Sequence, residues 1–142
     1  MNRMFTNLQN IVYQMIDFNL EKQKQFSKNL HSLYSEQFSR YYKTIEYNPG
    51  RQSGITTLIA KSVEQNDVVI VLTPALKKHM YNRISVFHLA NIPVFAINSL
   101  PPSNGTDTKY NRIWVDCASN MPQGIISEIY EKFNGNQYIF LG

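Results

Sequence analysis

Two short runs of consecutive apolar residues constrain the fold of this chain most strongly. Residues 68–72 read Val-Val-Ile-Val-Leu, and residues 94–97 read Val-Phe-Ala-Ile. A strand with one face in water alternates between apolar and polar residues, whereas a continuous apolar run indicates a strand that is covered on both faces. Such strands are typical of parallel sheets with a helical layer on each side. The two runs therefore predict an α/β protein.

Further apolar and helical segments extend this pattern through the second part of the chain. Strands are expected over residues 44–47, 68–72, 93–97, 113–115 and 138–141, and helices over 56–65, 76–90 and 124–133. Right-handed crossovers between parallel strands place helices on both faces of a sheet. We therefore expect a five-stranded, mostly parallel sheet with helices on both faces. An exposed loop is expected at 101–105, before the fourth strand.

The first 48 residues contain neither glycine nor proline, and this composition marks an internal boundary. We predict a helical segment over 1–43 and an α/β core over 44–142, together forming one compact domain. Apolar residues recur at helical spacing in the helical segment, which predicts two amphipathic helices with a break near 17–20, or one long helix. These apolar faces pack on the core or, alternatively, bind a partner. The first comprises Met4, Leu8, Ile11, Val12, Met15 and Ile16, and the second Phe26, Leu30, Leu33, Tyr34, Phe38 and Tyr41.

Charge and cysteine content narrow the class of protein. The net charge of +4 favours anionic partners such as nucleotides or nucleic acid. Cys117 is the only cysteine, so no internal disulfide can form and the expected location is the cytoplasm.

The early apolar residues are interrupted by Asn7, Gln9 and Asn10, which argues against a signal peptide. No apolar run approaches the roughly 18 residues that span a membrane, so no membrane partner is expected.

A glycine-containing loop follows the first expected strand and leads directly into a helix. Residues 48–57 read Asn-Pro-Gly-Arg-Gln-Ser-Gly-Ile-Thr-Thr. Glycines permit a tight turn whose N–H groups point inward, and the helix N-terminus adds a positive partial charge. Such a loop can hold a phosphate group. The alternative is a plain strand-to-helix turn in which Gly and Ser serve the backbone geometry.

This loop resembles the Walker A motif of P-loop NTPases, in the Gly-Arg-Gln-x-Gly-Lys-Thr form of helicase-like and phage terminase-like ATPases. The resemblance implies a RecA-like core over about residues 43–142 that binds ATP or ADP. In this sequence Pro49 stands at the position of the first motif glycine, and Ile55 at that of the lysine that contacts the β and γ phosphates. The implied nucleotide-binding residues are Gly50, Arg51, Gln52, Ser53, Gly54, Ile55, Thr56 and Thr57.

Residues 112–118, Arg-Ile-Trp-Val-Asp-Cys-Ala, resemble the Walker B strand of the same family. The resemblance implies that Thr56 and Asp116 bind Mg²⁺, and it places Cys117 where a catalytic glutamate usually stands. Because an isoleucine at the lysine position carries no charge, efficient hydrolysis is not expected. Arg51 partly replaces that lysine or is a solvated surface residue. From the residues alone, Asp116 could instead cap a turn, and Cys117 could be a small core residue.

The segment after the second expected strand resembles the part of helicase-like cores that contacts a nucleic-acid backbone. The implied contacts are Thr73, at the end of that strand, and Lys77, Lys78 and Arg83 on the following helix. The alternative is a basic helix face that is merely solvated. His31, His79 and His88 lack the spacing of metal ligands, and no role is assigned to them.

We predict a viral, in particular a phage, nucleotide-binding or assembly module that hydrolyses ATP weakly or not at all and acts in the host cytoplasm. One alternative is a non-catalytic module that kept the fold and binds DNA or a viral or host protein through its N-terminal helices or its basic helix. The other is an active ATPase. In that case Arg51 or a partner-supplied residue replaces the lysine, and a carboxylate such as Glu46 or Glu128 replaces the missing glutamate.

Overall fold

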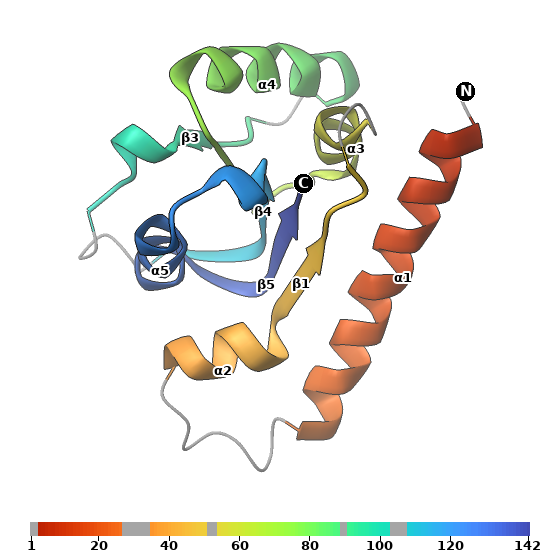
Figure 1. The fold of residues 1–142 in the computed structure, drawn as a ribbon, viewed down its shortest axis with the longest axis vertical. Helices are drawn as coiled ribbons and strands as arrows, with labels where there is room; N and C mark the ends of the chain where they lie inside the picture. The colour runs from red at the N-terminus through yellow and green to blue at the C-terminus, as the bar shows by residue number, and fades with distance from the viewer. Residues whose placement is uncertain (1–2, 27–34, 51–53, 89–90, 103–107) are drawn as a thin grey trace.

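The computed structural model describes residues 3–26, 35–50, 54–88, 91–102 and 108–142 of the chain. Its centre is a five-stranded sheet in the order β1-β5-β4-β2-β3, and every pair of neighbouring strands is parallel. Helices surround this sheet (Figure 1). The predicted α/β class with a five-stranded parallel sheet is therefore confirmed. The strands are β1 (Thr44–Tyr47), β2 (Val68–Val71), β3 (Val94–Ala96), β4 (Lys109–Asp116) and β5 (Asn134–Leu141).

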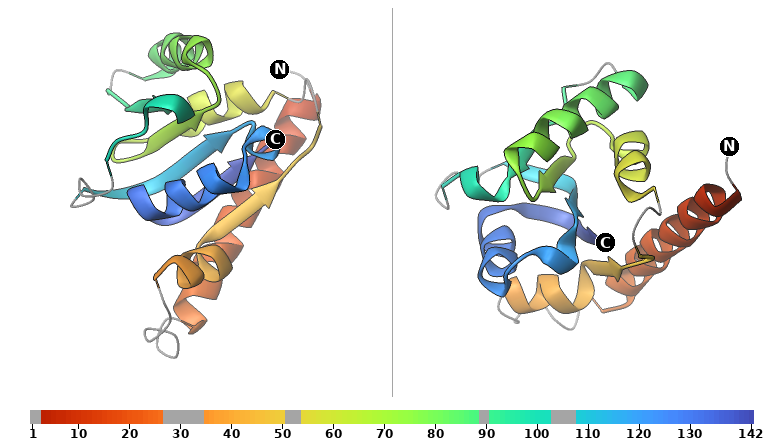
Figure 2. Two further views of the ribbon diagram at one scale, coloured as in Figure 1. Left: turned by 60° about the vertical axis from the view of Figure 1, so that its left-hand side comes forward. Right: turned by 45° about the horizontal axis from the view of Figure 1, so that its top comes forward.

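The helices form a layer on each face of the sheet (Figure 2). The chain steps in one direction through the sheet from β1 to β3 and steps back from β4 to β5, so right-handed crossovers place α3 and α4 on one face and α5 on the other. The described helices are α1 (Arg3–Phe26), α2 (Ser35–Tyr42), α3 (Ile55–Ser62), α4 (Pro74–Phe87) and α5 (Gln123–Lys132), with the 3-10 turns η1 (Ile97–Ser99) and η3 (Ala118–Asn120).

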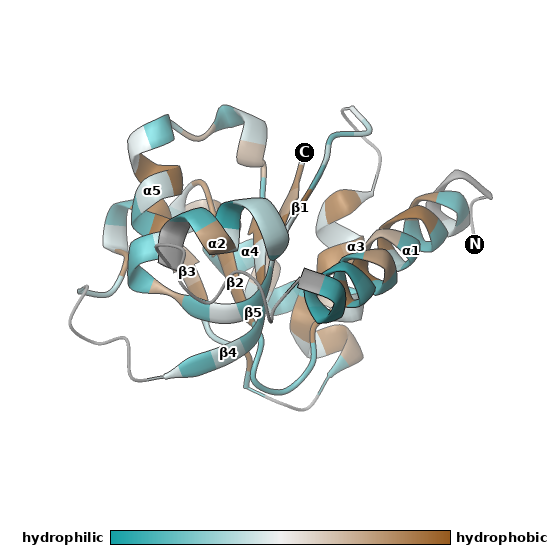
Figure 3. Ribbon diagram, turned by 90° about the horizontal axis from the view of Figure 1, so that it is seen from below, coloured by the Kyte–Doolittle hydropathy of each residue, from teal (hydrophilic) through white to brown (hydrophobic). Residues whose placement is uncertain are grey.

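Alternate residues of each strand enter two different cores. Val69 and Val71 of β2 pack with α1, α3 and α4, whereas Val68 and Ile70 pack with α5 on the opposite face. All four residues of β2 are buried, which is the physical reason for its continuous apolar sequence. Figure 3 shows β2 in brown, whereas the start of β4 is teal.

Helix α1 corrects the expectation for the N-terminal segment. It continues through residues 17–20, where a break was predicted, and α2 begins only at Ser35. Asp17 and Phe18 face solvent, while Val12, Ile16 and Asn19 form one continuous buried face. Asn19 also donates a hydrogen bond from Nδ2 to the carbonyl oxygen of Tyr42, 3.0 Å away. This packing on the sheet outweighs the weak helix propensity of aspartate.

Strand β4 is longer than predicted, because it begins at Lys109 and not at residue 113. Its polar first residues pair with β5, with Lys109 opposite Asn134 and Arg112 opposite Gln137. Hydrogen-bonded pairing therefore extends a strand that hydropathy alone would begin only at residue 113.

No helix among the described residues has the length and apolar character needed to span a membrane.

The strand register aligns the ends of the three strands nearest the glycine-containing loop. Tyr47, the last residue of β1, is opposite Leu141 of β5, and Leu141 is in turn opposite Asp116 of β4. The loop that follows β1 and the carboxylate that ends β4 therefore lie at the same edge of the sheet.

Candidate functional site

A cavity of about 440 Å³ lies at the carboxyl ends of β1, β4 and β5. Strand β1 leads into α3 on one face of the sheet, and β4 leads through η3 into α5 on the other. Parallel α/β sheets bind ligands outside the carboxyl ends of their strands, and the cavity lies at this edge of the sheet. Its described lining is Asn48, Gly50, Gly54, Ile55, Thr56, Thr57, Asp116, Cys117, Ser119, Asn120 and Gly142.

Two residues that are 60 positions apart in the sequence meet in this cavity. Thr56, in the first turn of α3, donates a hydrogen bond from Oγ1 to Oδ2 of Asp116 over 2.8 Å. Asp116 is the last residue of β4 and is only 5% exposed. The structure therefore brings together the two residues that the sequence assigned to one Mg²⁺ ion.

Glycines shape the loop that enters the cavity. Gly50 and Gly54 have φ angles of 98° and 87°, a left-handed conformation that residues with a Cβ rarely adopt. Gly54 is the N-cap of α3, and its carbonyl accepts the N–H of Leu58. The following N–H groups of the first turn open toward the cavity end of the helix. The predicted binding residues Arg51, Gln52 and Ser53 lie outside the described residues.

Ile55 lines the cavity from the position where the resembled motif has lysine. Its side chain is 8% exposed and belongs to the core formed with α1 and α4. A Cβ placed on Gly142 would lie 3.4 Å from Cδ1 of Ile55, so the side chain packs beside the end of β5. It contributes apolar surface and no positive charge.

The electrostatics of Asp116 are those of a carboxylate at the edge of the core. Burial raises its pKa above the ordinary value, because a charged carboxylate loses hydration there. The hydrogen bonds from Thr56 and Cys117 and the charge of His79 oppose this shift. A cation that approached from the cavity would favour the ionised form in the same way.

Cys117 borders the same cavity in a left-handed backbone conformation, with a φ of 59°. Burial raises the pKa of its thiol, and the adjacent Asp116 raises it further. A thiol with a raised pKa is a poor nucleophile, because the thiolate is the reactive form. The surroundings of Cys117 therefore favour its unreactive thiol form.

Asp116 is the only acidic side chain in the described lining of the cavity. Glu46 lines a different cavity of about 410 Å³, on the face that carries α5. Glu128 is exposed on α5, and its Oε1 lies 3.5 Å from Nζ of Lys132. Neither of these two candidate replacements for the catalytic glutamate faces Thr56.

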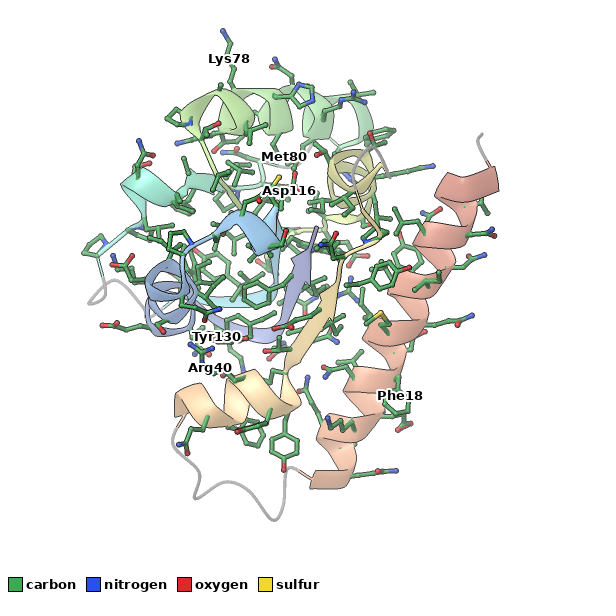
Figure 4. All side chains as sticks on the ribbon, in the orientation of Figure 1. Phe18, Arg40, Lys78, Met80, Asp116 and Tyr130 are labelled. Carbon is green, nitrogen blue, oxygen red and sulfur yellow. The ribbon has the colours of Figure 1, made fainter. Side chains whose placement is uncertain are left out.

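The predicted nucleic-acid residues do not share one surface. Thr73 is the N-cap of α4, and its hydroxyl accepts the N–H of Leu76 at 3.1 Å. Lys78 extends into solvent away from the molecule (Figure 4). Arg83 instead donates from Nη1 to Oγ1 of Thr57, 3.2 Å away, and so reaches toward the cavity. Lys77 is half-buried at the start of the helix.

Thr56 and Asp116 are the residues of the cavity that could hold a hard divalent cation such as Mg²⁺. Among the described residues, no group of three or more His, Cys, Asp or Glu is placed to hold a metal. Mg²⁺ does not require one, because it usually keeps several waters and binds one or two carboxylates together with substrate phosphates. Thr56 and Asp116 provide two oxygen atoms, and the phosphates would complete the coordination.

Sequence reasoning missed several residues of the cavity. Asn48, Ser119, Asn120 and Gly142 line it, although only Asn48 stood next to the predicted motif. The Nδ2 and Oδ1 atoms of asparagine and the serine hydroxyl are polar groups that suit a nucleotide. The only available signal was their place directly after expected strands, since such residues gather at the carboxyl edge of a parallel sheet.

The chain matches no protein-family model, and no curated protein matches it. Its sheet order and helical layers are consistent with a Rossmann-like or RecA-like fold. Its function must therefore be inferred from the geometry of the cavity itself.

Proposed function

We propose that this chain is a nucleotide-binding module of P-loop type that hydrolyses ATP weakly or not at all. The observation that carries the proposal is the 2.8 Å hydrogen bond between Thr56 Oγ1 and Asp116 Oδ2. It joins the start of the helix after the glycine-containing loop to the end of β4, inside a cavity at the carboxyl edge of the sheet.

The physical chemistry of this arrangement suits a phosphate group with a magnesium ion. The left-handed Gly54 turns the chain so that α3 begins at the cavity, and the unpaired N–H groups of its first turn attract an anion. Thr56 and Asp116 supply hard oxygen ligands beside that position. The ligand we propose is Mg²⁺ with ATP or ADP.

Two features favour binding over hydrolysis. Ile55 cannot neutralise the charge that develops on the phosphates as the bond breaks. In addition, Asp116 is the sole carboxylate in the described lining, so no second acid stands ready to orient an attacking water. An assembly role, in which the bound nucleotide stabilises one conformation, needs neither group.

The test is calorimetric titration with ATP and ADP, with and without Mg²⁺, on the wild type and Gly54→Val. Valine strongly disfavours the φ of 87° at this position. We expect saturable binding by the wild type and no measurable binding by Gly54→Val. The matched control is Gly124→Val, because Gly124 lies in α5 with open space around its Cβ position and no left-handed φ.

Equal affinity of Gly54→Val and the wild type would refute the proposed cradle. Absence of wild-type binding at millimolar nucleotide would refute the proposed function itself. Thermal unfolding of each variant, followed by circular dichroism, shows that a loss of binding is not a loss of fold.

A second candidate is a protein-binding module that uses α1, and a specific observation favours it. Phe18 is 75% exposed and Ile11 is 38% exposed, and both border a cavity of about 450 Å³ between α1 and β1. Binding through such apolar surface is insensitive to ionic strength, whereas binding of DNA by exposed lysines such as Lys78 weakens steeply as salt rises. Titrations of candidate partners at low and high salt separate these two modes.

A further inference from the structure

The described part of the proposed phosphate site offers no positive charge to a ligand. None of its described lining residues is Lys or Arg, and the only charged side chain among them is that of Asp116. A nucleoside triphosphate brings several negative charges, which require compensation near the helix N-terminus. In the resembled motif a lysine provides it, and here the position is Ile55. Arg51 of the same loop lies outside the described residues, so among the described residues a cation must come from another element.

Helix α4 packs against α3 and brings one arginine to the first turn of that helix. Nη1 of Arg83 donates a hydrogen bond to Oγ1 of Thr57 over 3.2 Å. Thr57 follows Thr56, which holds Asp116, and both threonines line the cavity. The guanidinium group thus lies beside the first turn of α3.

Arg83 keeps most of its binding capacity for an anion. A guanidinium has five N–H donors, and the contact with Thr57 uses one of them. Within the part of the chain that the structure describes, no carboxylate forms an ion pair with Arg83. The side chain is also exposed, so it can turn toward a phosphate without breaking core packing.

His79 lies one helical turn before Arg83, so the two side chains share one face of α4. Its charge acts on Asp116, which accepts the hydrogen bond from Thr56. Lys78, by contrast, points away from the molecule (Figure 4). Helix α4 therefore carries Arg83 and His79 on one face and a separate lysine that extends into solvent.

We propose that Arg83 supplies the positive charge that the phosphate-binding loop lacks at Ile55. This inference rests on the proposed nucleotide-binding function and assigns to it a residue outside the loop, on α4. It also removes Arg83 from the nucleic-acid surface that the sequence predicted. Arg83 would contact phosphate oxygens from the side of α4, while the N–H groups in the first turn of α3 would contact them from the helix end.

The experiment compares the affinity of Mg²⁺-ATP for the wild type, Arg83→Gln and Lys78→Gln. The two variants lose the same charge from the same helix, but of the two side chains only that of Arg83 contacts a residue that lines the cavity. We expect Arg83→Gln to weaken binding about tenfold and Lys78→Gln to leave it within about twofold of wild type, because a charge-assisted contact acts only at short range. Arg83→Lys keeps the charge and should retain most of the affinity.

The variant Ile55→Lys sharpens this test. If Arg83 performs the task of the missing lysine, Arg83→Gln should cost less affinity in an Ile55→Lys background than in the wild type. An equal cost in both backgrounds would show that Arg83 only positions Thr57, and it would overturn the proposal. Because Arg83 is exposed, its substitution should not change thermal unfolding, which verifies the fold.

Two results separate the failure of this inference from the failure of the function on which it rests. If Gly54→Val abolishes binding while Arg83→Gln and Lys78→Gln behave alike, the nucleotide site stands and the role of Arg83 is refuted. If the wild type binds no nucleotide, the function is refuted, and the role of Arg83 with it.

Discussion

The two ends of the sheet each bury an aspartate, and the two carboxylates are held in different ways. At the amino end of β2, Asp67 is fully buried and accepts three hydrogen bonds, from the N–H of Glu64, the N–H of Arg112 and Nε1 of Trp114. At the carboxyl end of β4, Asp116 accepts hydrogen bonds from the hydroxyl of Thr56 and from the adjacent Cys117, and it borders a cavity.

This difference shows how the surroundings of a carboxylate decide its role. The donors around Asp67 come from two elements, so the carboxylate ties the turn before β2 to β4 and leaves little capacity for a ligand. Asp116 keeps oxygen lone pairs that face open space. Burial raises the pKa of both groups, yet of the two only Asp116 borders the described cavity, from which a metal ion could replace one of its hydrogen-bond donors.

The largest expected effect comes from Asp67→Asn. The amide would direct an NH₂ group at one of the three N–H donors, which leaves buried donors without an acceptor. We expect the free energy of unfolding in urea to fall by about 3 kcal/mol, with nucleotide affinity unchanged in the folded protein. A comparable loss of nucleotide affinity would show that the two ends of the sheet are coupled.

The same substitution at the other end, Asp116→Asn, should give the opposite pattern. The amide oxygen can still accept the hydroxyl of Thr56, so we expect stability to change by about 1 kcal/mol or less. The neutral amide is a poorer Mg²⁺ ligand, and we expect ATP affinity in the presence of Mg²⁺ to fall about tenfold. Calorimetry without Mg²⁺ is the control, and an equal loss there would contradict a metal-binding role.

The smallest expected effect is a dependence of stability on pH. The folded-state pKa of Asp116 is raised above its ordinary value of 3.8, so folding favours the protonated carboxyl. The stabilisation that the protonated carboxyl of Asp116 contributes to the folded state is complete below about pH 4, and it is lost as the pH rises through the folded-state pKa. The free energy of unfolding in urea, taken as wild type minus Asp116→Asn, should therefore decrease as the pH rises from about 4 through the folded-state pKa. A difference that increased with pH would show that hydrogen bonds outweigh burial.

Much of the fold could be predicted because local sequence encodes it. The apolar runs at 68–72 and 94–97 correspond to β2 and β3, since strands covered on both faces have no polar positions. The predicted break near residues 17–20 was wrong, because the buried face that contains Ile16 and Asn19 continues across it. Local propensity is worth only tenths of a kcal/mol per residue, and tertiary burial easily exceeds it.

The candidate site could likewise be predicted only in part from the sequence. The sequence paired Thr56 with Asp116 through a resemblance to known motifs, and the structure places their oxygen atoms 2.8 Å apart. The sequence assigned Arg83 to nucleic acid with Lys77 and Lys78, because the three residues share one basic helix. Which side of that helix faces α3 is a matter of packing, and spacing along the chain does not reveal it.

The sequence by itself determined the α/β class, the order of strands and helices, and the position of a glycine-containing loop at a helix start, because periodicity and turn chemistry are local properties. Only the tertiary structure decided the strand order, which puts β5 between β1 and β4 and aligns Tyr47, Leu141 and Asp116 at one edge. It also decided which charges meet there. Contacts between distant residues depend on how whole elements pack, and the sequence of one segment does not contain that information.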